Sequence, residues 1–217
     1  MKEIKTIIFD FDGVLVDSVG IKDLAFEEMF KKYTAHYDEI MHYHKTHNAI
    51  IRFEKFEYIY KNILKEDFTE ELKESLSSQY SQFVKEKIIA LTAVKDSESF
   101  LHECHKKIPL YISSMNPEEE FKEILKARNI DRYFKGLYLY PWKKADALAD
   151  ILKVENINAN EALYIGDSPE DYEAAKQNSI NFIGRQSNRV IDETGVPIFS
   201  DFDEIKDYIE GRIQYAS

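Results

Sequence analysis

The sequence predicts an α/β fold in which a doubly wound parallel sheet carries an inserted all-helical domain. After residue 95, short apolar runs alternate with segments of helical periodicity, which is the pattern of repeated β-α-β units with right-handed crossovers. Another apolar run lies near the N-terminus, and residues 33–91 show helical spacing without a convincing strand. We therefore expect a core domain from residues 1–17 and 92–217, and a helical domain from residues 18–91.

The first strand is expected to begin at Ile4, because β-branched and aromatic residues follow one another there without polar alternation. A helix follows, which Asp17 or Ser18 can cap. The helical insertion of roughly four helices has apolar residues at helical spacing. These stripes are Ile21, Leu24, Ala25, Met29 and Phe30; Phe53, Phe56, Ile59, Tyr60 and Ile63; and Leu72, Leu76, Tyr80 and Phe83.

The apolar runs beyond residue 95 predict the remaining strands, and the periodic segments predict the helices between them. A proline in the first turn favours a helix start at Pro117. The expected strands are 108–112, 136–139, 162–165, 180–183 and 196–199. The expected helices are 97–106, 117–128, 144–152, 202–212 and one that contains 171–177.

Composition and charge limit the classes of function. A chain of 217 residues with 44% hydrophobic residues can bury a substantial core. Its formal net charge of −11 argues against a nucleic-acid-binding surface, which requires a basic face. We find neither a signal peptide nor an apolar run of about 18 residues, so we expect a cytoplasmic protein without a membrane partner. Cys104 is the one cysteine, which excludes an intramolecular disulfide and a cysteine-based zinc site.

Two carboxylates stand at the end of the first strand. Asp10 and Asp12 converge whether the strand continues or Gly13 turns it. Two like charges this close are unfavourable unless a cation neutralises them, so the pair favours a hard divalent metal, in the first place magnesium. The alternative is a polar turn that simply ends the strand, because Asp and Gly are common turn residues.

A second polar cluster follows the expected strand 108–112. Ser113, Ser114 and Asn116 lie at the strand end just before a helix, where hydroxyl and amide groups suit an anionic oxygen. Either Ser114 or Asn116 could instead be a helix N-cap. Ligands of doubly wound sheets bind beyond the carboxyl ends of the strands, so such clusters mark the candidate site.

Two further segments supply charges. In Gly166-Asp167-Ser168-Pro169-Glu170-Asp171, Asp167 stands at a strand end and Asp171 in the first turn of the next helix, where helix capping would also explain it. Lys143 and Lys144 stand at another helix start and are the candidates for a fixed positive charge near these acids. Most lysines are solvated, so neither one is diagnostic alone.

Together these segments resemble the four motifs of the haloacid dehalogenase (HAD) superfamily. Residues 10–13 match its DxDG pattern, and Asp17 and Ser18 match the pair that follows in members with a helical cap. The apolar strand ending at Ser113 is similar to the second motif, and residues 166–175 match GDSxxDxxxA. The resemblance implies a HAD-like Rossmannoid core with a helical cap, of the phosphoglycolate phosphatase and β-phosphoglucomutase subgroup.

The resemblance also implies chemistry for the acids. Asp10 is the expected nucleophile, which forms an aspartyl-phosphate, and Asp12 is the acid that protonates the leaving oxygen and then activates water. Magnesium is expected on Asp10, on the Asp12 backbone carbonyl and on Asp167. Asp171 is expected to orient Asp167 or a bound water, with Glu170 a less favoured supporting carboxylate.

The resemblance further implies the groups that bind phosphate. Ser113 is the expected hydroxyl, with Ser114 beside it and Asn116 in a supporting position. The family's lysine often lies two residues before an acid, and this spacing favours Lys144, with Lys143 as the alternative.

The acid at the second DxD position separates subclasses of the superfamily. Dehalogenases lack this acid and carbon–phosphorus hydrolases usually replace it, so Asp12 implies a phosphatase that acts on a small phosphorylated metabolite. A sugar phosphomutase of the β-phosphoglucomutase type keeps it too and is the alternative. A non-catalytic binding protein on this fold would lack Asp10, Asp12 or Asp167, and all three are present.

Cations and histidines of the helical insertion are the remaining candidates. Arg52 and Lys55 could grip a second anionic group of the substrate, although ion pairs with Glu54 or Glu57 explain them as well. We interpret the histidines as solvated or packed side chains rather than a zinc site, because no carboxylate stands at a telling spacing. They are His36, His42, His44 and His47.

Overall fold

The computed structural model forms two compact units, each with its own core. One comprises residues 1–17 and 91–217, which we call the sheet unit, and the other comprises residues 18–90, which we call the helical unit. The structure describes residues 3–47, 50–187, 189–191 and 195–210. Among these residues, no helix combines the length and the apolar character needed to cross a membrane.

The sheet unit is built on a six-stranded sheet with the order β3-β2-β1-β4-β5-β6, in which every pairing is parallel. This confirms the predicted α/β fold. The strands are β1 (Thr6–Phe9), β2 (Leu110–Ser113), β3 (Gly136–Tyr138), β4 (Ala162–Gly166), β5 (Asn181–Arg185) and β6 (Ile198–Phe199). The described helices are α5 (Ser97–Cys104), α6 (Glu118–Ala127), η2 (Asp131–Tyr133), α7 (Lys144–Glu155), η3 (Ala159–Glu161), α8 (Pro169–Gln177) and α9 (Phe202–Ile209).

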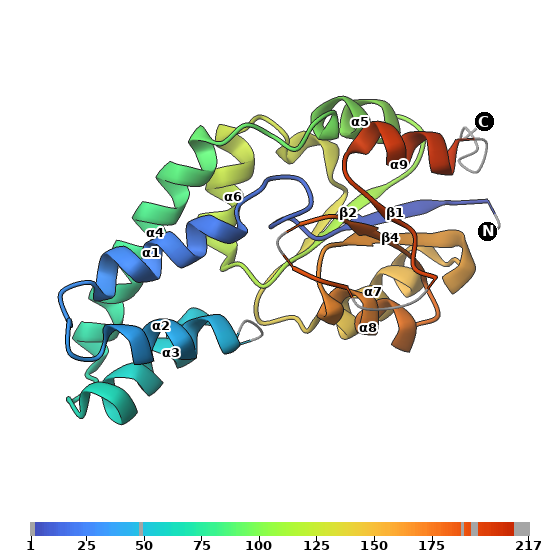
Figure 1. Cartoon of the computed structure of the whole chain (residues 1–217). Coiled ribbons are helices and arrows are strands. Elements are labelled where there is room, and N and C mark those ends of the chain that lie inside the picture. The colour runs from blue at the N-terminus through green and yellow to red at the C-terminus, as the bar shows by residue number, and fades with distance from the viewer. Residues whose placement is uncertain (1–2, 48–49, 188, 192–194, 211–217) are drawn as a thin grey trace. The chain divides into compact units, whose positions relative to one another are not determined.

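Side chains of β1 alternate between two cores, because a strand has a side-chain period of two. The ring centroid of Phe9 lies 6.2 Å from that of Phe100 in α5 and 6.4 Å from that of Phe202 in α9. Ile8 belongs to a cluster on the other face with Leu148 of α7. Figure 1 shows α5 and α9 on one side of the strands and α7 and α8 on the other. Burial on both faces explains why β1 has a continuous apolar sequence.

Several element ends differ from the prediction. The β5 strand extends to Arg185, because Gly184 and Arg185 pair with Ile198 and Phe199 of β6, beyond the point where the apolar run ends. The last strand, predicted over 196–199, comprises only Ile198 and Phe199 as β6. The predicted helix 202–212 ends at Ile209 as α9, and residues 211–212 lie outside the described part of the chain.

The helical unit has an aromatic core. The Phe26 ring lies 5.4 Å from Phe56 and 5.7 Å from Tyr80, measured between centroids. The helices of the described residues are α1 (Val19–Phe30), α2 (Tyr37–Thr46), α3 (Arg52–Tyr58), the π-helical η1 (Ile59–Leu64) and α4 (Glu70–Ala90). The insertion is therefore helical, as predicted.

One position of the predicted apolar stripes is wrong. Leu24 is 49% exposed, whereas Phe26 is buried; on α4 the predicted Phe83 is half-buried and its neighbour Val84 is buried. Where two nearby residues of a helix are both apolar, either one can satisfy the 3.6-residue spacing. The spacing therefore does not determine which of the two faces the core. Contacts with neighbouring helices decide it.

His44 of α2 is buried between an anion and a cation. Its ring stacks on Phe26 with centroids 3.8 Å apart, and its Nε2 lies 2.8 Å from Asp23 Oδ1. Lys55 Nζ lies 3.3 Å from His44 Nδ1 and donates a hydrogen bond to the His44 carbonyl at 3.0 Å. Burial lowers the pKa of His44 below its usual 6.5, and the charge of Lys55 acts in the same direction, against the hydrogen bond to Asp23.

We expect His44 to make the folded protein less stable as the pH falls below about 6.5. In this range the unfolded chain binds a proton on His44 more readily than the folded chain, so the free energy of unfolding decreases with decreasing pH. Urea unfolding at about pH 7.5 and about pH 5.5 measures the effect, with His44→Gln as the comparison. Equal pH dependence in both proteins would contradict the assignment to His44.

Candidate active site

Three of the predicted site residues stand at the carboxyl edge of the sheet. Asp10 directly follows β1, Ser113 is the last residue of β2, and Asp167 directly follows β4. Because β1 pairs in parallel with both β2 and β4, these three strand ends lie at the same level. Residues far apart in the sequence thereby become neighbours.

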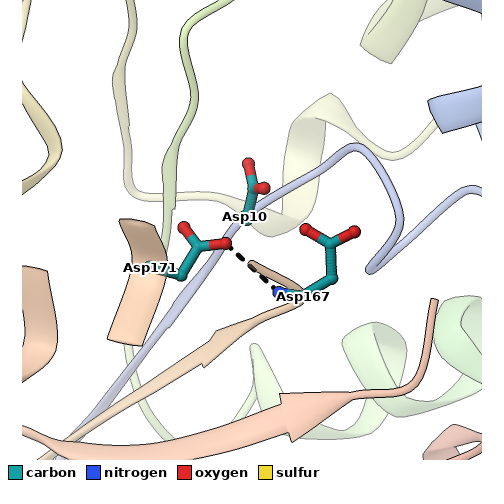
Figure 2. A group of neighbouring side chains, drawn as sticks. All are labelled: Asp10, Asp167 and Asp171. Atoms are coloured by element: carbon teal, nitrogen blue, oxygen red, sulfur yellow. Dashed lines mark hydrogen bonds between the residues drawn. The ribbon is translucent and has the colours of Figure 1, made fainter. Parts of the chain in front are cut away.

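Asp10, Asp167 and Asp171 form one buried group of carboxylates. Ligand oxygens from the three residues all lie within 4.8 Å of one another. Figure 2 shows the side chains coming from the end of β1, the end of β4 and the start of α8, with their carboxyl groups on the same side. Asp10 and Asp167, the predicted metal ligands, are therefore neighbours, and Asp171 completes the group.

Asp171 links the start of α8 to this group. Its Oδ2 accepts hydrogen bonds from the Ser168 hydroxyl at 2.7 Å and from the Asp167 backbone N–H at 3.2 Å. The Asp171 N–H donates to Ser168 Oγ at 3.3 Å and the Ser168 N–H donates to Asp171 Oδ2 at 3.1 Å, and these two bonds together form a capping box. The carboxylate also accepts hydrogen bonds from Lys144 and from the Tyr164 hydroxyl. Asp171 is thus both the third helical residue of the α8 capping box and a member of the carboxylate group.

Gly166 allows Asp171 to fold back under the end of β4. A Cβ atom at this glycine would stand 2.4 Å from the Asp171 Cβ and 2.7 Å from its Cγ. A larger residue would therefore displace the Asp171 carboxylate. This steric requirement explains why a glycine stands at position 166.

Lys144, the first residue of α7, is the lysine that enters the site. Its Nζ lies 3.2 Å from Asp10 Oδ2, whereas the preceding Lys143 is exposed. Burial lowers the pKa of Lys144, but the carboxylates of Asp10 and Asp171 outweigh that effect and raise its pKa overall. The lysine therefore stays positively charged within the carboxylate group.

Burial raises the pKa of two carboxyl groups of the site. The pKa of Asp10 rises to about 7, mainly because burial removes water, and repulsion from neighbouring carboxylates adds to this effect against the attraction of Lys144. The pKa of Asp167 rises to about 6, again chiefly through burial. A cation bound among these oxygens would favour their ionised forms.

The donor set fits a divalent cation. Asp167 Oδ2 is buried, and no described residue forms a hydrogen bond with it. Such an orphaned acceptor is unfavourable unless a further group binds it. All the side-chain donors of the group are carboxylate oxygens, which are ligands that Mg²⁺ prefers.

Asp12 lies beside this group and is held by the segment after β2. Asn116 Nδ2 donates hydrogen bonds to Asp12 Oδ2 at 2.8 Å and to Ser114 Oγ at 3.0 Å. Ser113 is buried at the end of β2. Gly13 has a φ of +82°, a conformation that favours glycine and lets the chain turn directly after Asp12.

Two residues outside the predicted positions also contact the carboxylate group. In the sequence, Tyr164 looks like an ordinary buried residue of an apolar strand. In the structure its hydroxyl donates a hydrogen bond to Asp171. The rule that a buried tyrosine hydroxyl needs a partner could have pointed to it. Arg189 lies in the segment between β5 and β6, and its Nη1 lies 3.2 Å from Asp167 Oδ1. No short-range sequence pattern points to Arg189.

Glu170, the less favoured supporting carboxylate, is exposed.

The candidate cations of the insertion are engaged within the helical unit. Arg52 Nη2 donates to Ser81 Oγ at 2.7 Å, and the guanidinium lies 4.8 Å from the ring centroid of Tyr80. Lys55 is buried against His44. The other histidines of the cluster occupy half-buried or exposed positions, namely His36, His42 and His47.

Comparison with known proteins identifies relatives of this arrangement. A family model described as haloacid dehalogenase-like hydrolase matches residues 7–185. A phosphoglycolate phosphatase of Pseudomonas fluorescens is 30% identical over 101 residues, which make up 44% of this chain and 36% of that protein. The chain thus aligns with little more than a third of that relative's length.

Solved structures extend the likeness over nearly the whole chain. A predicted phosphoglycolate phosphatase from Haemophilus somnus has a TM-score of 0.74 and 19% identity, covering 97% of this chain and 100% of that one. The HAD hydrolase YfnB from Bacillus subtilis, bound to magnesium, has a TM-score of 0.72 and 17% identity, covering 96% and 99%. At these identities the matches establish the fold.

We expect Asp171→Ala to destabilise the protein by about 3 kcal/mol or more, because it removes the side-chain half of the α8 capping box and one carboxylate partner of the half-buried Lys144. Urea unfolding followed by circular dichroism measures this loss. Glu170→Ala removes the adjacent exposed acid and should stay within about 0.5 kcal/mol of the unaltered protein. A similar loss in both variants would show that the buried network adds nothing.

Proposed function

Because the chain belongs to the haloacid dehalogenase-like hydrolase family, we propose that it is a magnesium-dependent phosphatase that hydrolyses a small phosphorylated metabolite. The observation that carries this proposal is the convergence of Asp10, Asp167 and Asp171 in one buried group beside Lys144. Carboxyl groups with pKa values perturbed by burial and by charged neighbours are typical of functional sites.

Asp10 is the proposed nucleophile. Its Oδ1 accepts a hydrogen bond from the Phe11 N–H at 2.8 Å and its Oδ2 lies 3.2 Å from Lys144 Nζ, so both oxygens are held in place. In the first step an Asp10 oxygen bonds to phosphorus while the bond from phosphorus to the ester oxygen breaks, giving an aspartyl-phosphate. In the second step water attacks phosphorus, which releases inorganic phosphate and restores the carboxylate.

Asp12 is the proposed acid and base. It gives a proton to the departing ester oxygen in the first step and takes one from the attacking water in the second, so the protons balance over the cycle. The Asn116 amide, which donates to Asp12 Oδ2, holds this carboxyl in position. The neighbouring acids thus divide the chemistry between attack and proton transfer.

Magnesium would be held by the carboxylates of Asp10 and Asp167 and by the backbone carbonyl of Asp12. Asp171, which accepts a hydrogen bond from the Asp167 N–H, would fix the position of Asp167. When bound, the ion offsets the repulsion between the anionic phosphate and the Asp10 carboxylate.

Lys144 and the hydroxyls of Ser113 and Ser114 are the proposed ligands of the phosphate oxygens. The Ser114 backbone N–H donates to the Tyr138 carbonyl at 2.9 Å, so it is the hydroxyl of this residue that we expect to face phosphate. The positive charge of Lys144 near Asp10 Oδ2 would also stabilise the negative charge on the phosphoryl group during its transfer.

The helical unit is the proposed cap, and we assign substrate selection to it. Arg52 is half-buried, whereas Lys55 is buried against His44. Of these two cations, Arg52 is therefore the better candidate to bind a second anionic group of the substrate.

We expect release of inorganic phosphate from several small phosphate esters in the presence of Mg²⁺, and none after treatment with a chelator. Asp10→Asn should lower kcat/KM by about 10³-fold or more, because an amide is a far weaker nucleophile. Asp131→Asn, which changes an exposed acid of η2, should retain full activity. A panel of phosphorylated metabolites with a colorimetric phosphate assay provides the measurement.

Two other results would replace the proposal. Isomerised sugar phosphate with little free phosphate would identify a phosphomutase. Tight binding of a metabolite without turnover, in the presence of Mg²⁺, would identify a non-catalytic binding protein on this fold.

A further inference from the structure

Arg189 contacts the carboxylate group from a segment that none of the sequence motifs includes. It lies between β5 and β6, and its Nη1 is 3.2 Å from Asp167 Oδ1. The side chain of Asp167 is fully buried, and that of Arg189 is 24% exposed. The guanidinium therefore reaches the site from its edge and forms an ion pair with Asp167 there.

This ion pair lies within a group of four carboxylates. Lys144 contacts two of them, Asp10 and Asp171, and Arg189 contacts Asp167. Burial lowers the pKa of Arg189, but Asp167 and, more weakly, the other three acids raise it overall, so the guanidinium lies in the field of the whole group. The four acids are Asp10, Asp12, Asp167 and Asp171.

We propose that Arg189 is the protein's own counter-ion for Asp167 and that it limits how tightly the site binds a divalent cation. The inference rests on the magnesium-dependent function proposed above. A guanidinium next to a metal ligand repels an incoming cation and neutralises part of the charge that attracts it. The same contact stabilises Asp167 when no metal is bound, because a buried carboxylate without a partner is unfavourable.

The alternative is that Arg189 only orients Asp167 for metal binding. Other contacts already hold this residue, since its side chain is enclosed and its N–H donates to Asp171 Oδ2 at 3.2 Å. Arg189 binds Oδ1, whereas Oδ2 has no hydrogen-bond partner in the described structure. If Arg189 only orients Asp167, its removal should weaken metal binding. If its charge competes with the metal, its removal should strengthen metal binding, so the two explanations predict opposite changes in metal affinity.

The test compares Arg189→Gln, Arg189→Met and Arg189→Lys with the unaltered protein by calorimetric titration with Mg²⁺ alone. We expect the two neutral variants to bind Mg²⁺ roughly 3- to 30-fold more tightly, as the loss of one nearby positive charge implies. Arg189→Lys keeps the charge and should remain near the original Kd. Arg132→Gln, which changes an exposed arginine of η2, is the control for a change of net charge.

Thermal unfolding in a chelator provides the second readout, which needs no catalysis. The neutral variants should have a lower Tm than the unaltered protein without metal, and a larger gain in Tm when Mg²⁺ is added. Unchanged or weaker Mg²⁺ binding in both neutral variants, while the unaltered protein binds it, would overturn this inference and leave the proposed function standing. Failure of the unaltered protein to bind Mg²⁺ would overturn both.

Discussion

The structure of the site depends on balancing carboxylates that are removed from water. Asp10, Asp167 and Asp171 are buried within 4.8 Å of one another, a placement that is unfavourable for like charges unless cations accompany them. Lys144 contacts Asp10 and Asp171, and Arg189 contacts Asp167. The proposed divalent cation would further offset the repulsion between these carboxylates and favour their ionised forms.

Secondary structure and site are built from the same hydrogen bonds at the start of α8. The capping box between Ser168 and Asp171 satisfies backbone groups of the first helical turn, and the same carboxylate reaches Lys144 and Tyr164. Gly166 leaves the space that this fold-back needs. The start of α8 therefore also fixes the position of an acid in the site. A change in the local fold there would shift the Asp171 carboxylate.

The fold supports the site through burial of the central strand. Side chains of β1 pack alternately on α5 and α9 and on α7, so Asp10 emerges from a strand that is held on both faces. The neighbouring strands β2 and β4 are held in register with it. This arrangement fixes the positions of groups that come from distant segments, as the proposed attack of Asp10 on phosphorus would require.

The sequence by itself determined the strands, the helical insertion and the polar residues at strand ends, because periodicity and turn chemistry are local properties. It also indicated Asp10, Asp12 and Asp167 through motifs of a few residues. For the lysine, the motif spacing favoured Lys144 over Lys143, and the fold places Lys144 beside Asp10. The tertiary structure alone decided that Phe26 replaces Leu24 in the core and that Arg189 pairs with Asp167. These outcomes depend on which segments the folded chain brings together, and no short-range pattern records such contacts.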